Sequence, residues 1–245
     1  MNPARRAVVS IVGAGLVVLL VMVIILVFGV IPLPDFPSLA DQPDPSIPGT
    51  VAYVGFDGGP CLFTVPASGG ETREVWCGRE YVEFPMWSSD GLLVLNDWTV
   101  EPTYLVIDPV SGTEVDRLPI GDQGADAEPI PYPLDKRRER ADGAIVLVEG
   151  RGNGEAEVVV RLSDGSERMI LSVTDAPSDY YFHESQWSPD GEWVLITDNA
   201  GRLLIVGANG TPDARVLVDD LQDWGAQAAW YIPGNDTYTV DIAGR

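Results

Sequence analysis

Apolar residues follow two different patterns along the chain. From Ala7 to Ile31 no residue carries a charge, and this run is long enough for a membrane-spanning helix, which needs roughly 20 residues. After Thr50 the apolar runs are only a few residues long and are separated by Gly, Asp, Ser and Pro, as in β-strands joined by turns. No apolar pattern with the 3.6-residue period of a helix follows. The pattern predicts one transmembrane helix, residues 7–31, followed by an all-β domain.

Charged residues on either side of the apolar run predict its orientation. Arg5 and Arg6 precede the run and acidic residues follow it, and an excess of positive charge marks the cytoplasmic side of a membrane helix. We therefore expect residues 1–6 in the cytoplasm and the C-terminal part outside the cell membrane. A cleaved signal peptide, with its cleavage site at Ser38–Ala40, is the alternative. The apolar run exceeds the roughly 7–15 residues of a signal peptide and ends well before that site, so an uncleaved anchor is the preferred interpretation.

The segment 32–49 is rich in proline. Its prolines are Pro32, Pro34, Pro37, Pro43, Pro45 and Pro48. Because proline fixes φ and lacks an N–H group, the segment is expected to form an extended, semi-rigid stalk. Residues 50–245 then form the extracytoplasmic domain, which is long enough to bury a sizeable core.

Four glycine turns recur at similar spacing in this domain. Each follows a short apolar run and stands among small polar residues, as in a β-hairpin. The glycines are Gly69, Gly112, Gly165 and Gly210, at spacings of 43, 53 and 45 residues. They predict one hairpin in every repeat of about 45 residues.

A tryptophan phrase recurs in the same frame. "MWSSDG" begins at Met86 and "QWSPDG" at Gln186, and the Asp-Gly pair suits the end of a type I turn. Trp230 occupies the same place in a third unit, and Tyr132 in the remaining one. The residues that we expect the repeat to place are Trp87, Asp90, Gly91, Trp187, Asp190, Gly191 and Trp230. Units of this length with several short strands are typical of β-propeller blades, so four units and a surplus C-terminal segment predict four or five blades.

Two stretches carry a family resemblance. Trp187-Ser188-Pro189-Asp190-Gly191 with the strand-like run after it resembles the repeat of TolB-type β-propellers, which is WD-like, and "LFTVPASGGE" from Leu62 is similar to that family's strand and turn. The resemblance covers residues 51–242 and is strongest at Trp87 and Trp187. It implies a binding scaffold and no fixed chemistry. The family usually has six or more blades, so the ring here is either smaller or open and completed by a partner.

The domain is strongly acidic. The chain has a formal net charge of −22, and all 37 Asp and Glu residues follow the apolar run. Such a surface argues against nucleic acid as a partner, because phosphates need a basic face. It also argues against broad adhesion to anionic lipid.

Cysteine and histidine limit the chemistry. Cys61 and Cys77 are the only cysteines and lie equally far from Gly69, so they face each other across a hairpin and are expected to form a disulfide outside the cell. The alternative is a pair of reduced core cysteines. His183 is the only histidine, which excludes zinc sites with several histidines. No nucleophile elbow, P-loop or HExxH motif occurs, so we expect no metal, no cofactor and no enzymatic activity.

Two segments are candidates for binding. Tyr180, Tyr181 and Phe182 with His183 precede the second tryptophan strand, where exposed aromatics would mark a binding surface; the alternative is burial between blades. The basic run Asp135–Arg140 either docks an acidic partner or is a solvated turn, and the turn is favoured.

These features predict a single-pass membrane protein that binds a protein or cell-envelope ligand as a scaffold or sensor. A propeller-based hydrolase or lyase is one alternative, and it should show clustered polar residues with perturbed pKa values in the centre of the propeller. An accessory subunit of a membrane complex is the other. Small residues at Ser10, Gly13 and Ala14 would then allow close helix approach.

Overall fold

The computed structural model describes residues 33–56, 59–78, 82–97, 103–119, 137–150, 154–219, 221 and 227–242. The predicted helix at residues 7–31 and the degenerate repeat position Tyr132 lie outside these ranges. Within them, no helix has the length and hydropathy of a membrane span. The chain divides into Met1–Asp35 and a compact unit, Phe36–Arg245, which contains the β-sheets.

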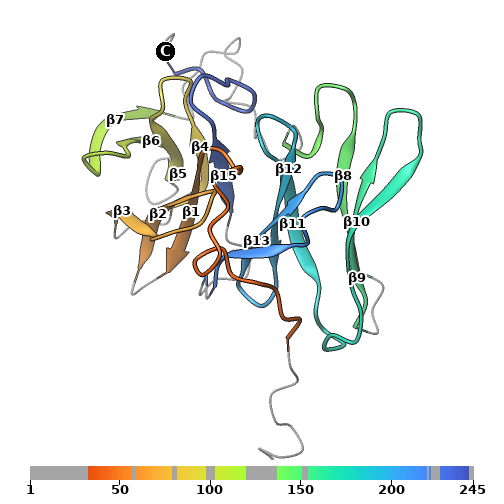
Figure 1. Ribbon diagram of the computed structural model, residues 1–245. Helices are drawn as coiled ribbons and strands as arrows, with labels where there is room; N and C mark the ends of the chain where they lie inside the picture. The colour runs from red at the N-terminus through yellow and green to blue at the C-terminus, as the bar shows by residue number, and fades with distance from the viewer. Residues whose placement is uncertain are drawn as a thin grey trace, which may run out of the picture. The chain divides into compact units, whose positions relative to one another are not determined.

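The named elements of the described residues are β-strands, grouped in four antiparallel sheets (Figure 1). The first sheet has the order β15-β1-β2-β3 and contains β1 (Thr50–Phe56), β2 (Pro60–Pro66), β3 (Arg73–Cys77) and β15 (Ala228–Tyr231). The second runs β4-β5-β6-β7 and contains β4 (Val82–Trp87), β5 (Leu93–Asp97), β6 (Thr103–Asp108) and β7 (Thr113–Pro119). The third contains β8 (Ile145–Gly150), β9 (Ala156–Arg161) and β10 (Glu167–Val173). The fourth runs β11-β12-β13-β14 and contains β11 (Phe182–Trp187), β12 (Trp193–Asp198), β13 (Leu203–Gly207) and β14 (Arg215–Val218).

The glycine turns join the last two strands of every sheet, as the sequence predicts. Gly69 lies between β2 and β3, Gly112 between β6 and β7, Gly165 between β9 and β10, and Gly210 between β13 and β14. All four have positive φ values, a backbone conformation that glycine adopts without a steric cost. The all-β prediction and the hairpin of each repeat are confirmed, and the four sheets form a propeller-like arrangement.

Burial changes from the middle to the edge of a sheet. Every residue of β5 and of β13 is buried, whereas β7 is exposed along almost its whole length. A strand covered on both faces reads as a continuous apolar run, and an edge strand carries charged residues. This explains why "LVLND" and "TEVDRLP" belong to the same sheet.

The first sheet combines strands from distant parts of the chain. β15 pairs with β1 in antiparallel register, with Val51 opposite Trp230 and Ala52 opposite Ala229. Figure 1 shows the blue β15 beside the orange β1. A strand from the C-terminal side thus completes a sheet begun on the N-terminal side.

Apolar contacts between neighbouring sheets form the core. The third and fourth sheets share a cluster that includes Val146, Val158, Val194 and Ile196. The fourth and first share one that includes Leu203, Ile205, Val51 and Val65. The first and second share one that includes Ala52, Leu62, Leu93 and Leu105. Each sheet is stabilised by burial against its neighbours, at roughly 25 cal/mol for each Å² of apolar surface.

Residues 36–49 pack against the sheets. Leu39 and Ile47 are buried in the cluster between the fourth and first sheets, and Ser38 forms a parallel bridge with Val216. Asp44 pairs with Arg215 at 3.0 Å. The stalk predicted for residues 32–49 is therefore mostly part of the compact unit, because two apolar side chains between the prolines are buried against the domain.

The repeated tryptophans lie at equivalent places in three sheets. Trp87 ends β4, Trp187 ends β11 and Trp230 lies in β15, and all three are buried. Their indole N–H groups donate to the carbonyl oxygens of Ala229, Arg138 and Pro48, at 3.0, 3.0 and 2.9 Å. Each carbonyl acceptor belongs to a segment far in sequence from the tryptophan that donates to it, so each indole joins two separate parts of the fold.

The turns after Trp87 and Trp187 are built alike. The hydroxyls of Ser88 and Ser188 donate to Asp90 and Asp190, and Gly91 and Gly191 have positive φ. Tyr231 stacks on Trp87 with ring centroids 4.9 Å apart. The Arg140 guanidinium takes the corresponding place over Trp187, 4.8 Å from the ring centroid.

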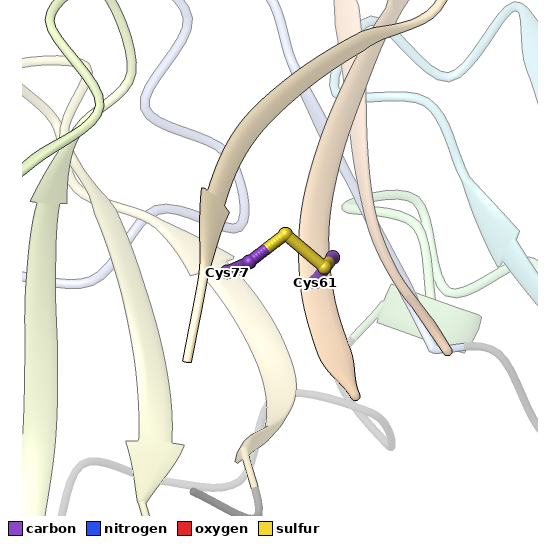
Figure 2. Close-up of a disulfide and its surroundings, with 2 residues drawn as sticks. All are labelled: Cys61 and Cys77. Atoms are coloured by element: carbon purple, nitrogen blue, oxygen red, sulfur yellow. A yellow bond between two sulfur atoms is a disulfide. The ribbon is translucent and has the colours of Figure 1, made fainter. Parts of the chain in front are cut away.

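The predicted disulfide is confirmed. Cys61 and Cys77 lie opposite each other in the register of β2 and β3, and Figure 2 shows the bond that joins these two strands. Glu74 is close to both sulfur atoms. Because both sulfur atoms are used in the disulfide, these residues do not form a thiolate metal site.

Candidate functional site

The aromatic segment before β11 divides between the core and the surface. Tyr180 and Phe182 are 4% and 5% exposed and belong to the core between the third and fourth sheets. The Tyr180 hydroxyl donates to Asp198 at 3.1 Å. Tyr181 is 40% exposed, and its ring lies 6.3 Å from that of the exposed His183. Side chains alternate between the core and the surface along this segment, so only Tyr181 and His183 of the four are available to a ligand.

A buried arginine connects the inner strands of the first and second sheets. Arg137, in the basic run expected to be a solvated turn, is 3% exposed. Its guanidinium donates to the carbonyl oxygens of Ala228 in β15 at 2.8 Å and Pro85 in β4 at 3.0 Å. Gln186 of β11 donates to the same Ala228 carbonyl at 2.8 Å. The guanidinium group is planar and has several donors in fixed directions, which suits it to bridge two carbonyl groups. Arg137 therefore holds the inner strands together and is not available for docking a partner.

Glu184 lies beside this arginine in a partly desolvated position. Burial raises the pKa of its carboxyl group, while His183, Arg138 and Arg137 act in the opposite direction. The adjacent Ser185 hydroxyl is buried without a hydrogen-bond partner among the described residues, next to a small cavity that Glu184, Gln186 and Thr197 also line. This inner polar cluster therefore contains a carboxyl group that burial makes harder to ionise.

A larger groove lies near the start of β12, beyond the Trp187 end of β11. It has a volume of about 500 Å³, within the roughly 300–1,000 Å³ of small-ligand sites. The third and fourth sheets and the N-terminal segment contribute to it. Its lining residues are Ser46, Arg140, Arg168, Gly191, Glu192, Trp193, Gly207, Ala208, Asn209 and Thr211.

The two arginines of the groove differ in their partners. Arg140 forms two hydrogen bonds with Asp142, at 2.9 and 2.6 Å, and a third with the Gly191 carbonyl at 3.1 Å. The Arg140 hydrogen bond is the main reason why the pKa of Asp142 falls to about 2. Arg168 donates to the Ala208 carbonyl at 2.7 Å, and among the described residues no carboxylate lies within ion-pair distance of it. Arg140 is thus neutralised, whereas Arg168 keeps free donors and an unbalanced charge.

Sequence reasoning did not identify this groove. Its residues come from five separated stretches, and each is an ordinary turn or strand residue in its own segment. The only signal was the scarcity of basic residues, 15 against 37 acidic ones, and it does not single out Arg168.

Among known proteins, only solved structures match the chain. No family model and no curated protein matches the chain. TolB from Acinetobacter baumannii is 16% identical with a TM-score of 0.26, and an uncharacterized protein from Listeria monocytogenes EGD-e is 11% identical with a TM-score of 0.27. Both matches cover 78% of this chain and 55% of the other, so the chain spans about half the length of these structures. A GH43 glycoside hydrolase is 13% identical with a TM-score of 0.25, over 80% of this chain and 41% of that one.

One of these structures is a TolB protein. At these identities and TM-scores no activity and no family membership follows from them.

Proposed function

We propose that the protein is a membrane-anchored extracytoplasmic binding module that holds a cell-envelope ligand in the groove at Trp193 and Arg168. The observation that supports it is the groove itself, because its volume suits a small ligand or a ligand segment and its wall combines an indole ring with polar groups. Residues 7–31 would serve as the anchor, with residues 1–6 in the cytoplasm. The disulfide between Cys61 and Cys77 agrees with an oxidising compartment.

Site-specific photo-crosslinking in intact envelopes tests this function. Asn209 is exposed and lines the groove, and it would be replaced by a photoreactive phenylalanine analogue in the full chain. Val110, which is 82% exposed in the turn between β6 and β7, is the matched control position. We expect a defined adduct from position 209 and none from position 110. Adducts of the same size from both positions, or none from position 209, would refute the groove as the binding site.

The alternative of a hydrolase or lyase is supported by one observation, the raised pKa of Glu184. A carboxylic acid with a raised pKa keeps its proton to a higher pH and can act as a general acid. The test is Glu184→Gln, which should abolish turnover of an envelope polysaccharide without lowering the melting temperature if Glu184 is the acid. Equal turnover in both proteins, or none in the wild type, would exclude this role.

A further inference from the structure

Among the described residues Arg168 has no carboxylate at ion-pair distance, whereas Arg140, the other arginine of the groove, has one. Arg140 is bound by Asp142 through two hydrogen bonds. Glu167, the acidic neighbour of Arg168 in β10, pairs with Arg161 at 2.9 Å. Among the described residues Arg168 has one hydrogen bond, to the Ala208 carbonyl. A guanidinium group has five N–H donors, so most of those of Arg168 remain for a ligand.

The single hydrogen bond of Arg168 also fixes its position. It connects β10 of the third sheet to the turn between β13 and β14 of the fourth, and the Ala208 N–H in turn donates to the Glu192 carbonyl at 2.8 Å. A guanidinium that is held in this way loses less entropy when it binds a planar oxyanion through two parallel hydrogen bonds.

We propose that the groove binds small ligands through an oxyanion, a carboxylate or a phosphate, and that Arg168 is the residue that recognises it. The inference rests on the proposed binding function and names its ligand class. Trp193 gives an apolar wall beside the charge, so the anion is carried on a ring or a short chain that contacts the indole. In a chain with a net charge of −22, anions meet repulsion over most of the surface, so the unpaired Arg168 favours their binding in this groove.

Glu192 allows a second test of the proposal, in which the expected change in affinity has the opposite sign. Its carboxylate also lines the groove, and it is exposed. A negative charge there weakens the attraction of Arg168 for an anion. Glu192→Gln should therefore strengthen anion binding, whereas Arg168→Gln should weaken it.

The experiment measures binding of three probes to the full-length protein in detergent by calorimetry. Inorganic phosphate and glucuronate represent the two oxyanions, and glucose is the neutral control. We expect the wild type to bind one of the two anions and not glucose, with an affinity that falls as salt is added. Arg168→Gln should lower the affinity about 10- to 100-fold, the usual effect of losing a charge-assisted hydrogen bond.

Arg161→Gln is the matched control, since it removes an exposed arginine from the same sheet that lies outside the groove lining. Its affinity should equal that of the wild type. Preference for phosphate over glucuronate, or the reverse, assigns the oxyanion. Equal affinity of wild type and Arg168→Gln, or no binding of either anion, would overturn the proposal. If crosslinking at position 209 still succeeds in that case, only the anion assignment fails and the binding function stands.

Discussion

Replacing Trp187 with alanine removes the largest fully buried side chain in the described part of the protein, at 0% exposure. The indole packs in the core between the third and fourth sheets, its N–H donates to Arg138, and Arg140 covers its face. Deleting a large buried aromatic costs about 3–5 kcal/mol of unfolding free energy, and the unpaired Arg138 carbonyl adds to the loss. A domain of this size then melts roughly 6–20 °C lower.

Urea denaturation followed by tryptophan fluorescence and circular dichroism measures this cost. Trp187→Phe keeps one aromatic ring but loses the N–H donor and part of the indole volume, so it should cost more than about 1 kcal/mol and less than Trp187→Ala. Tyr181→Ala is the control, because a change at this exposed position should stay within about 0.5 kcal/mol of wild type. A Trp187→Ala protein within about 1 kcal/mol of wild type, or no more affected than Tyr181→Ala, would show that the repeat tryptophan does not hold the sheets together.

Three further changes test other parts of the structure. Arg137→Met should cost about 3 kcal/mol, since it removes two charge-assisted hydrogen bonds to backbone carbonyls, whereas Arg161→Met at an exposed pair should cost under about 1 kcal/mol in the same urea titration; equal losses would refute the bridging role. Serine at both Cys61 and Cys77 should cost about 3 kcal/mol by loosening the unfolded-state constraint, and reductant should lower the stability of the wild type alone; an unchanged midpoint would contradict a contribution of the disulfide. Glu184→Gln should stabilise the protein near neutral pH, because the raised pKa of Glu184 makes ionisation unfavourable in the folded state above its ordinary value of 4.5. That gain should disappear as the pH falls below 4.5, and a difference that does not change with pH would show that desolvation of Glu184 is not its cause.

Local sequence signals predicted the strands and turns well. Gly69 and Gly165 mark hairpins because a positive φ is a property of the residue itself and of the turn. The pairing of Cys61 with Cys77 also follows from their distances to one turn. In these cases the determining interactions lie within one hairpin, so a single stretch of sequence contains the information.

Features that depend on distant segments were not predicted. Arg137 is buried because the Ala228 and Pro85 carbonyls are brought to it from other sheets, and nothing in the basic run itself reveals this. Leu39 is buried against the strands near Val216. The prolines around it predicted an extended, semi-rigid stalk, because the local sequence does not show which distant strands Leu39 contacts. The groove at Arg168 likewise forms only after five segments come together.

The pairing of β15 with β1 affects how the chain is made. During synthesis Thr50–Phe56 emerges long before Ala228–Tyr231, so until then one edge of the first sheet has unpaired backbone groups that can capture strands of other chains. Contacts between such distant segments also form slowly. A nascent chain therefore passes through a period of vulnerability to aggregation, which ends when β15 docks on β1. A chain that stops before Ala228 lacks β15 and leaves this edge of the first sheet unpaired.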